Sequence, residues 1–281
     1  MSIKKYQFFL NTGQHQFDIP NVSLGNSIPK IIYQTYKNRS ALKPEWIKNI
    51  QKICKLNPEW EYHFFDDKEV EEFIFLEYGE KFLKQYLAIS PELGPARADL
   101  FRYLLLYKKG GVYLDIKTTL TKPLDSVLNV DDVYILSHWP NQLYQPKELI
   151  HLNYQEIIQW AILAAPGHPF LRNVINNVLG NLQVYNPWLH GVGKRGVLRI
   201  TGPYAYTCAI ESIRHKYSFR FTNITAELGI YYSLYELWDE FKSKADNENH
   251  MSVHGHYSRS KQLILSRKNI STFLYRILHN N

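Results

Sequence analysis

Apolar and polar positions change from a helical to an extended pattern within one stretch of the chain. Residues 95–109 carry apolar side chains at helical spacing, with Leu100 and Leu104 on one stripe. Gly110 follows this pattern and marks the end of the predicted helix. Residues 112–116 then form a short, mostly apolar run that fits a buried strand.

The same patterns predict further elements on both sides of this stretch. Strands are predicted at residues 28–36, 60–65, 133–137, 160–165 and 220–222, and helices at 43–57, 68–78, 168–182, 204–213 and 260–279. Asp67 is the predicted N-cap of the helix at 68–78. Strands alternate with helices through the first half, which predicts the α/β class with a mainly parallel central sheet flanked by helices.

Polar residues at the ends of predicted strands indicate a shared site. Gln34, Asp66 and Asp115 each fall at the carboxyl end of a predicted strand. In parallel sheets, ligands bind at the carboxyl ends of the strands. These three residues are therefore expected to face one ligand.

Two pairs of charged residues interrupt the apolar pattern of the central stretch. Asp99 and Arg102 are three positions apart, which places them on one helical face. Asp115 and Lys117 are two apart, which would place them on one strand face. Carboxylates and cations at a strand end suit a nucleotide or diphosphate site, whereas a purely structural salt bridge is the alternative for Asp99 and Arg102.

Composition narrows the choice of partners. The chain has 281 residues, enough for one large α/β domain, and 33 Lys and Arg against 26 Asp and Glu give a net charge of +7. This excess favours anionic partners, or it serves solubility alone. Cys54 and Cys208 form neither a disulfide framework nor a zinc signature. The sequence shows no signal-peptide pattern and no apolar run of roughly 18 residues, so a cytoplasmic location is expected.

Five motifs in order carry a resemblance to a known family. They are IPKIIYQTY, NPEWEYHFFDD, ADLFRYLLLYKKGGVYLDIKT, APGHPFL and TGP, and they begin at residues 28, 57, 98, 165 and 201. In this order they resemble the glycosyltransferases with a DXD sugar-binding motif, a family that includes initiating α-mannosyltransferases of fungi and many capsule and lipopolysaccharide enzymes. The resemblance covers roughly residues 28–260, between an N-terminal arm at 1–27 and a basic amphipathic helix at 261–281.

The resemblance implies a GT-A fold and a retaining glycosyltransferase. Such an enzyme would move a hexose from a UDP- or GDP-sugar to a glycan, glycolipid or polysaccharide acceptor. Asp99 and Arg102 would contact the sugar and the diphosphate of the donor, and Asp115 would contact the ribose and a metal. The other residues expected at the donor are Gln34, Thr35, Asp66, Gly111 and Tyr113.

The sequence departs from the family pattern at the second motif acid, which is Lys117 here. Mg²⁺ and Mn²⁺ require oxygen ligands, which an ammonium cannot supply. Three interpretations stay open. In the first, a metal binds through Asp115, the diphosphate and either His254 or His256. In the second, Lys117 itself neutralises the diphosphate as a catalytic residue beside Asp115 and Arg102. In the third, the site binds donor without turnover.

A binding protein is the rival class. A catalytically silent binder of nucleotide-sugars, or of an anionic surface, would share the same charge and aromatic content. The sequence shows no nucleic-acid-binding signature. The basic tail at 261–281 would place the protein peripherally on anionic lipid near a lipid-linked acceptor, or would pack as an ordinary helix.

Overall fold

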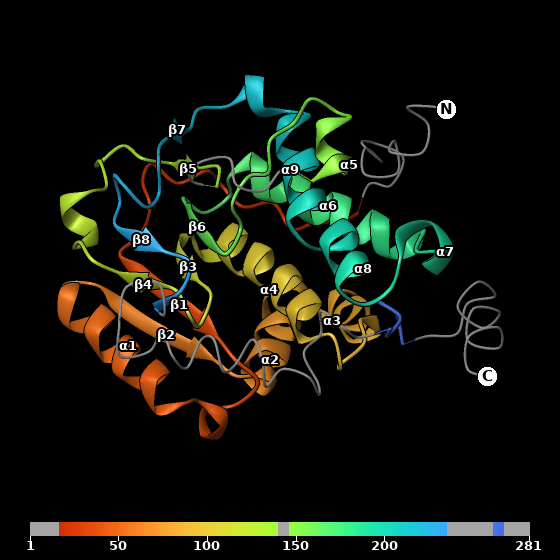
Figure 1. Ribbon diagram of the computed structural model, residues 1–281, viewed down its shortest axis with the longest axis horizontal. Coiled ribbons are helices and arrows are strands. Elements are labelled where there is room, and N and C mark those ends of the chain that lie inside the picture. Colours follow the sequence, from red (N-terminus) through yellow and green to blue (C-terminus); the bar gives the residue numbers. More distant parts are fainter. Residues whose placement is uncertain (1–16, 140–145, 235–260, 267–281) are drawn as a thin grey trace.

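The protein is built on a six-stranded sheet. The computed structural model describes residues 17–139, 146–234 and 261–266. Within these residues the strand order is β2-β1-β3-β6-β5-β7 (Figure 1). The strands are β1 (Ile31–Thr35), β2 (Glu61–Phe65), β3 (Gly111–Leu114), β5 (Tyr134–Leu136), β6 (Ala161–Ala164) and β7 (Arg220–Phe221).

Most neighbouring strands in this sheet run parallel. β1 pairs in parallel with β2 and β3, and β5 pairs in parallel with β7. β6 lies antiparallel between β3 and β5. A second, two-stranded sheet joins β4 (Thr119–Leu120) to β8 (Ile230–Tyr231) beside the end of β3 (Figure 1). The predicted α/β class with a mainly parallel sheet is confirmed.

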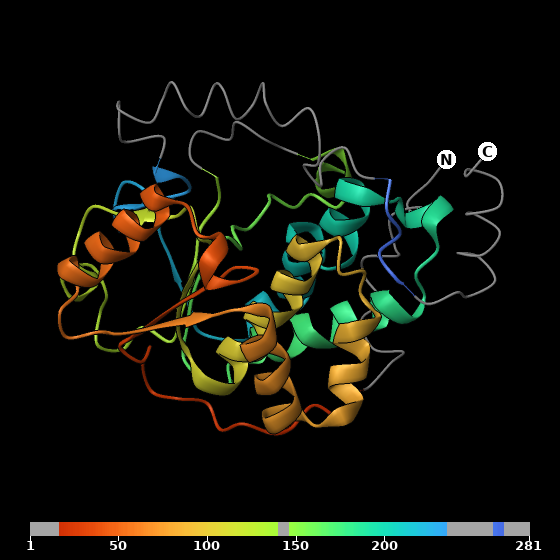
Figure 2. The same ribbon diagram turned by 90° about the horizontal axis from the view of Figure 1, so that it is seen from below.

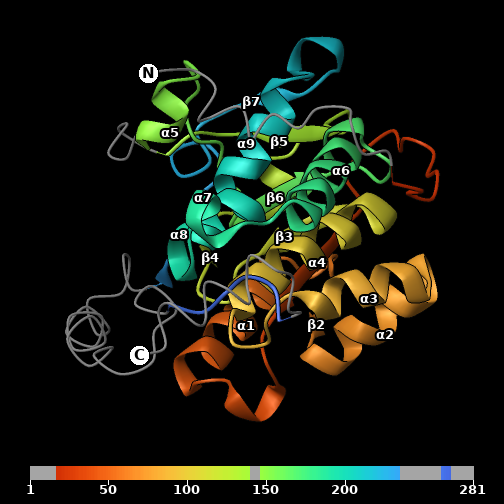
Figure 3. The ribbon, with the colours of Figure 1, turned by 90° about the vertical axis from the view of Figure 1, so that its right-hand side faces the viewer.

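Helices cover both faces of the main sheet. They are α1 (Pro44–Leu56), α2 (Asp67–Tyr78), α3 (Glu80–Ala88), α4 (Gly94–Lys109), α5 (Lys147–Ile150), α6 (Pro169–Gln183), α7 (Pro187–His190), α8 (Gly193–Ile200) and α9 (Pro203–Glu211). One face carries α4 and α6, and α1 lies on the other side together with β4 and β8 (Figure 2). Figure 3 shows α2 and α3 side by side next to α4.

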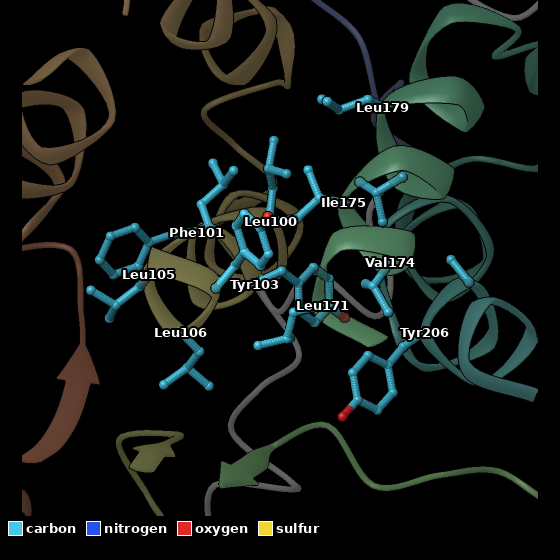
Figure 4. Packing of buried hydrophobic residues seen from close by; sticks show 14 of the residues in the cluster. Leu100, Phe101, Tyr103, Leu105, Leu106, Leu171, Val174, Ile175, Leu179 and Tyr206 are labelled. Atoms are coloured by element: carbon cyan, nitrogen blue, oxygen red, sulfur yellow. The ribbon is translucent and has the colours of Figure 1, made fainter. Parts of the chain in front are cut away.

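Helix α4 is the central packing element. Its residues from Leu100 to Tyr107 are all buried, including Arg102, so it is enclosed on every side rather than amphipathic. Leu100 and Tyr103 face Leu171 and Val174 of α6 in one apolar cluster (Figure 4). Because α4 is held on all sides, the polar groups that it carries have fixed positions.

Two glycines make the connection from α4 to β3. Gly110 and Gly111 have φ of +67° and +102°, a region that side chains rarely adopt. A Cβ on Gly110 would lie 2.5 Å from Cδ of Pro166, and one on Gly111 would lie 2.8 Å from the carbonyl oxygen of Ile31. Because the Gly110–Gly111 connection is short, β3 and the residues after it lie directly beside α4.

The structure corrects two local predictions. Strand β3 ends at Leu114, and the Thr118 N–H donates to the Asp115 carbonyl at 2.8 Å, which makes residues 115–118 a turn. Asp115 and Lys117 therefore do not share a strand face. Asp66, not Asp67, caps α2, because its side chain accepts from the N–H groups of Lys68 and Glu69.

The segment 261–266 differs from its prediction. It is non-helical and lies against the core, with Ile264 fully buried and Leu265 bridged to Ile89. The predicted helix is thus wrong at these six positions, and its remainder lies outside the described residues.

In the described part of the chain, no helix combines the length and the apolar character that crossing a membrane requires.

Candidate functional site

Asp99, Arg102 and Asp115 meet at the carboxyl end of β3. Nη2 of Arg102 lies 3.3 Å from Oδ1 of Asp99 and 3.0 Å from Oδ1 of Asp115. The first two residues come from α4, and the third follows β3. The tight connection between these elements brings them together, so one guanidinium stands between two carboxylates.

The guanidinium of Arg102 is saturated with acceptors. Its Nη1 donates to the carbonyl and to Oε1 of Gln159 at 2.8 and 2.9 Å, and its Nε donates to the carbonyl of Ala98 at 3.3 Å. With the two carboxylates, five acceptors face the five N–H donors of an arginine. The ring of Tyr113 lies 4.6 Å from the guanidinium carbon. Arg102 is therefore held rigidly and is itself almost fully covered.

Asp99 is buried but well supplied with donors. Thr201 Oγ1 donates to its Oδ2 at 2.9 Å, and Gln159 Nε2 donates to its Oδ1 at 3.1 Å. Burial raises the pKa of Asp99 to about 6, against the opposing effects of Arg102 and Thr201. Two of its partners, Gln159 and Thr201, come from segments far along the chain.

Asp115 is the member of this group that reaches solvent. Its side chain is 34% exposed, whereas that of Arg102 is 4% exposed. Desolvation raises the pKa of Asp115, against the effects of Arg102 and of a hydrogen bond with Tyr113. Its backbone carbonyl accepts from Nε2 of Gln34 at 3.0 Å, and the Tyr62 hydroxyl in turn donates to Oε1 of Gln34 at 2.9 Å. Gln34 and Tyr113 thus position Asp115.

Lys117 lies on the other side of the turn, against α1. Its Nζ is 5.9 Å from the ring centroid of Trp46, and Nζ of Lys43 is 5.3 Å from the same ring. Burial lowers the pKa of Lys117, and the nearby Lys43 lowers it further. Both ammonium groups thus lie near Trp46 in the first turn of α1, where Glu45 opposes the effect of Lys43 on Lys117.

The described residues do not fit a divalent metal. Within them, no three His, Cys, Asp or Glu side chains are grouped closely enough to hold one. Asp115 is a single carboxylate, and its Oδ1 already pairs with Arg102. Hard cations require several oxygen ligands, and the neighbouring motif position carries an ammonium. The predicted ligands His254 and His256 lie outside the described residues.

Three other predicted donor residues have local structural roles. Thr35 Oγ1 donates to the carbonyl of Phe65 at 2.8 Å and thereby joins β1 to β2. The Asp66 carboxylate caps α2. Gly111 begins β3, at the end away from Asp115, where its backbone conformation excludes a side chain. None of these three shares a described contact with Asp99, Arg102 or Asp115.

Gln159 and Thr201 complete the site but were not predicted. Gln159 bonds both Asp99 and Arg102, and Thr201 bonds Asp99. A single polar residue inside the apolar run IIQWAILA is the signal that could have identified Gln159. Thr201 belongs to the TGP motif, which by itself reads as a turn.

Part of the sequence resembles known glycosyltransferases. Residues 43–134 match the family described as "Glycosyltransferase sugar-binding region containing DXD motif". Inositol phosphoceramide mannosyltransferase 3 of Schizosaccharomyces pombe is 34% identical over 153 residues, which are 54% of this chain and 37% of that protein. Initiation-specific alpha-1,6-mannosyltransferase of the same organism is 26% identical over 215 residues, which are 70% of this chain and 50% of that protein. The chain therefore spans half or less of the length of these relatives.

Solved structures give more distant likenesses. PaToxG glycosyltransferase has a TM-score of 0.46 at 14% identity, over 98% of this chain and 88% of that chain. The UDP-bound glycosyltransferase domain of the YGT toxin has a TM-score of 0.46 at 9% identity, over 90% of this chain and 89% of that chain.

The family match includes the charged group at the end of β3. Asp99, Arg102 and Asp115 all lie within the matched residues 43–134, whereas Gln34 precedes them and Thr201 follows them. The expected α/β class with a mainly parallel central sheet is confirmed by the strand order and pairing. Over this region the chain resembles the family described as a glycosyltransferase sugar-binding region with a DXD motif.

Proposed function

We propose that this protein transfers a hexose from a UDP- or GDP-sugar to a glycan or lipid-linked acceptor, with retention of the anomeric configuration. The observation that supports this most directly is the Asp99–Arg102–Asp115 group, at a strand end inside the family region. The relatives named as mannosyltransferases support sugar transfer as the reaction class.

The three-residue group suits the recognition of sugar hydroxyls. The two carboxylates of Asp99 and Asp115 carry more negative charge than the Arg102 guanidinium offsets, so this group would repel a diphosphate. Asp115 is exposed enough to accept hydrogen bonds from hydroxyl groups of the donor. Arg102 has no donor left for a ligand, so in this proposal it is a positioning residue that holds Asp115 in place.

The charge of the leaving diphosphate requires a separate cation. As the bond from the anomeric carbon to the phosphate oxygen breaks, negative charge develops on the nucleoside diphosphate. Lys117 and Lys43 both lie near Trp46 in the first turn of α1, where the helix dipole is also favourable to anions. We assign this charge stabilisation to Lys117 in place of a metal, because the described acids do not fit one.

Retention is proposed to proceed on one face of the sugar. Asp99 is buried and paired, and Asp115 pairs with Arg102, so neither carboxylate is free to act as a covalent nucleophile. The acceptor oxygen would bond to the anomeric carbon as the phosphate leaves, and the departing phosphate oxygen would take the acceptor's proton. Trapping of a glycosyl-enzyme intermediate would contradict this route.

Release of nucleotide from a panel of UDP- and GDP-sugars, with and without EDTA, tests the proposal. Release from one donor, lost in Asp115→Asn, is the expected result. Lys117→Met is expected to reduce kcat by about 100-fold, as loss of a charge-stabilising group does. Lys216→Met, on an exposed 3-10 turn, is the control and should leave kcat unchanged. Persistence of release in EDTA supports Lys117, and its loss would show that a metal binds.

The silent binder remains the second candidate, because the motif acid is replaced by Lys117. Donor binding by calorimetry, without release from any donor in the presence of candidate acceptors, would establish that function instead of transfer.

A further inference from the structure

Three aromatic rings gather next to the carboxylate site. The rings of Trp139 and Trp160 have centroids 5.8 Å apart, and Tyr232 lies 5.3 Å from each of them. Trp139 follows β5, Trp160 precedes β6 and Tyr232 follows β8, so three separate segments converge here. Tyr232 is 45% exposed, whereas Trp160 is buried. The cluster thus has a buried base and an exposed ring.

Polar atoms without partners lie inside this cluster. Glu156 is 5% exposed; its Oε1 accepts from Nε1 of Trp139 at 2.7 Å, but its Oε2 is buried and has no hydrogen-bond partner. Nε1 of Trp160 is also buried without a partner. A buried polar atom left unsatisfied costs about 1–3 kcal/mol. Among the described residues, these two atoms around the same rings are left without a partner.

The chain connects this cluster directly to the proposed donor site. The Asp115 N–H donates to the Trp160 carbonyl at 2.8 Å. In the segment 156–160, Gln159 points to Arg102 and Asp99, whereas Ile158 and Trp160 belong to the apolar cluster on the opposite face of the sheet. Thr118, at the end of the turn that carries Asp115, bonds the carbonyl of Tyr232. The aromatic cluster and the donor-binding side chains therefore lie at the same strand end, on opposite faces of the sheet.

The geometry of the rings limits the ligand. Their planes are inclined at 47° to 71° and their centroids lie within 5.8 Å, so the rings contact one another and leave no cage for a cation between them. Their outer surface can instead stack against the C–H face of a pyranose. Burial raises the pKa of Glu156 to about 7, so near neutral pH this carboxyl can both donate to and accept from hydroxyl groups.

We propose that Trp139, Trp160, Tyr232 and Glu156 form the subsite for the acceptor sugar, a pyranose whose hydroxyls bond Glu156 and the Trp160 N–H. The assignment to the acceptor rests on the proposed function, in which the donor sugar binds Asp115 beside Arg102 of α4. The rings and the unsatisfied polar atoms, in contrast, support a pyranose site independently of catalysis.

Binding of methyl α-glycosides of mannose, glucose and galactose to the full chain tests the subsite, measured by saturation-transfer NMR and by tryptophan fluorescence. At least one glycoside should bind the wild-type protein. Tyr232→Ala should weaken that binding about tenfold, the effect of losing one aromatic contact. Glu156→Gln keeps the acceptor for Trp139 but removes the titratable oxygen, and it should weaken binding by a similar factor.

Tyr217→Ala is the matched control, because Tyr217 is another exposed tyrosine, outside this cluster. It should bind the glycoside as the wild type does. Absence of binding to every glycoside, or equal binding by the Tyr232 and Tyr217 variants, would overturn the subsite.

The donor assay distinguishes this inference from the proposed function. Glycoside binding that depends on Tyr232, together with no donor turnover, would leave the sugar subsite standing and refute transfer. Donor turnover with an acceptor KM that is unchanged in Tyr232→Ala would establish transfer and refute the subsite.

Discussion

At the scale of single residues, Arg102 organises the candidate site. It is buried, it has an acceptor for each of its donors, and it separates two carboxylates that would otherwise repel each other. Arg102 suits this position because its planar group offers several fixed donors, which lysine lacks. Replacement by lysine would leave part of this network unsatisfied.

Arg102→Met is expected to lower the free energy of unfolding by about 3–5 kcal/mol, the usual cost of leaving a buried charge without its partner. Urea denaturation followed by circular dichroism measures the change. The double variant Asp99→Asn with Arg102→Met should recover part of the loss, because one of the two stranded carboxylates is then neutral. A loss below about 1 kcal/mol in the single variant would contradict the burial of this network.

At the scale of elements, helix caps decide the roles of His168 and of Asp66, which the sequence alone assigned to the donor site. Asp66 caps α2 and forms a capping box with Glu69. His168 caps α6, because its Nδ1 accepts from the Phe170 N–H at 3.2 Å. Both residues lie in motifs that resemble the family, yet their side chains serve the local backbone.

Asp66→Ala is expected to lower the free energy of unfolding by about 1 kcal/mol through loss of the cap. Asp67→Ala, at the next position, should change stability less, because no cap depends on it. Urea titration of both variants gives this comparison. A larger loss for Asp67→Ala, or a large rise in donor KM with unchanged stability for Asp66→Ala, would return Asp66 to the donor site.

His168 should make stability depend on pH. Burial lowers its pKa to about 4, and protonation would remove the acceptor that caps α6. A group whose pKa is lower in the folded state contributes stability above its unfolded pKa of about 6.5, and this stability is lost as the pH falls through about 4. Relative to His168→Asn, whose amide also caps, the wild type should lose about 3 kcal/mol over this window.

Urea denaturation at several pH values between 4 and 7.5 measures this dependence. His215→Asn, at an exposed histidine, serves as the control and should follow the wild-type curve. Parallel curves for the wild type and His168→Asn would show that His168 does not carry the acid sensitivity.

At the scale of the whole molecule, the segment 261–266 belongs to the core rather than to a separate tail. Ile264 is fully buried in the large apolar cluster, and its carbonyl accepts from the Ser90 N–H at 2.8 Å. The Gly193 N–H donates to the Gln262 carbonyl at 2.8 Å, so the segment lies between the start of α8 and the residues before α4. Residues 261–266 therefore pack against the same apolar cluster as α4 and α6.

Truncation after residue 260 is expected to lower the free energy of unfolding by about 3–6 kcal/mol, because two buried aliphatic side chains are each worth about 1.5–3 kcal/mol. Truncation after residue 266 removes none of the described packing and should retain most of the stability. Thermal unfolding of both proteins gives the comparison. Equal melting temperatures would contradict the packing of residues 261–266.

The sequence by itself determined the elements whose signals are local. The strand–helix alternation, the stop at Gly110, and the placement of Asp99 beside Arg102 depend on side-chain period and backbone geometry within a few residues. The same signals were ambiguous where two local structures compete. Residues 115–118 could continue β3 or form a turn. Either Asp66 or Asp67 could cap α2, because moving the start of the helix by one residue leaves its apolar periodicity nearly unchanged.

Only the tertiary structure decided which distant residues complete the site. Gln159 and Thr201 bond Asp99 although they lie 60 and 102 positions away, and Lys117 lies against Trp46 of α1 rather than beside Asp115. The aromatic cluster of Trp139, Trp160 and Tyr232 likewise joins three segments. Such contacts follow from how the sheet orders its strands and which face each loop covers, and neither periodicity nor spacing along the chain encodes that arrangement.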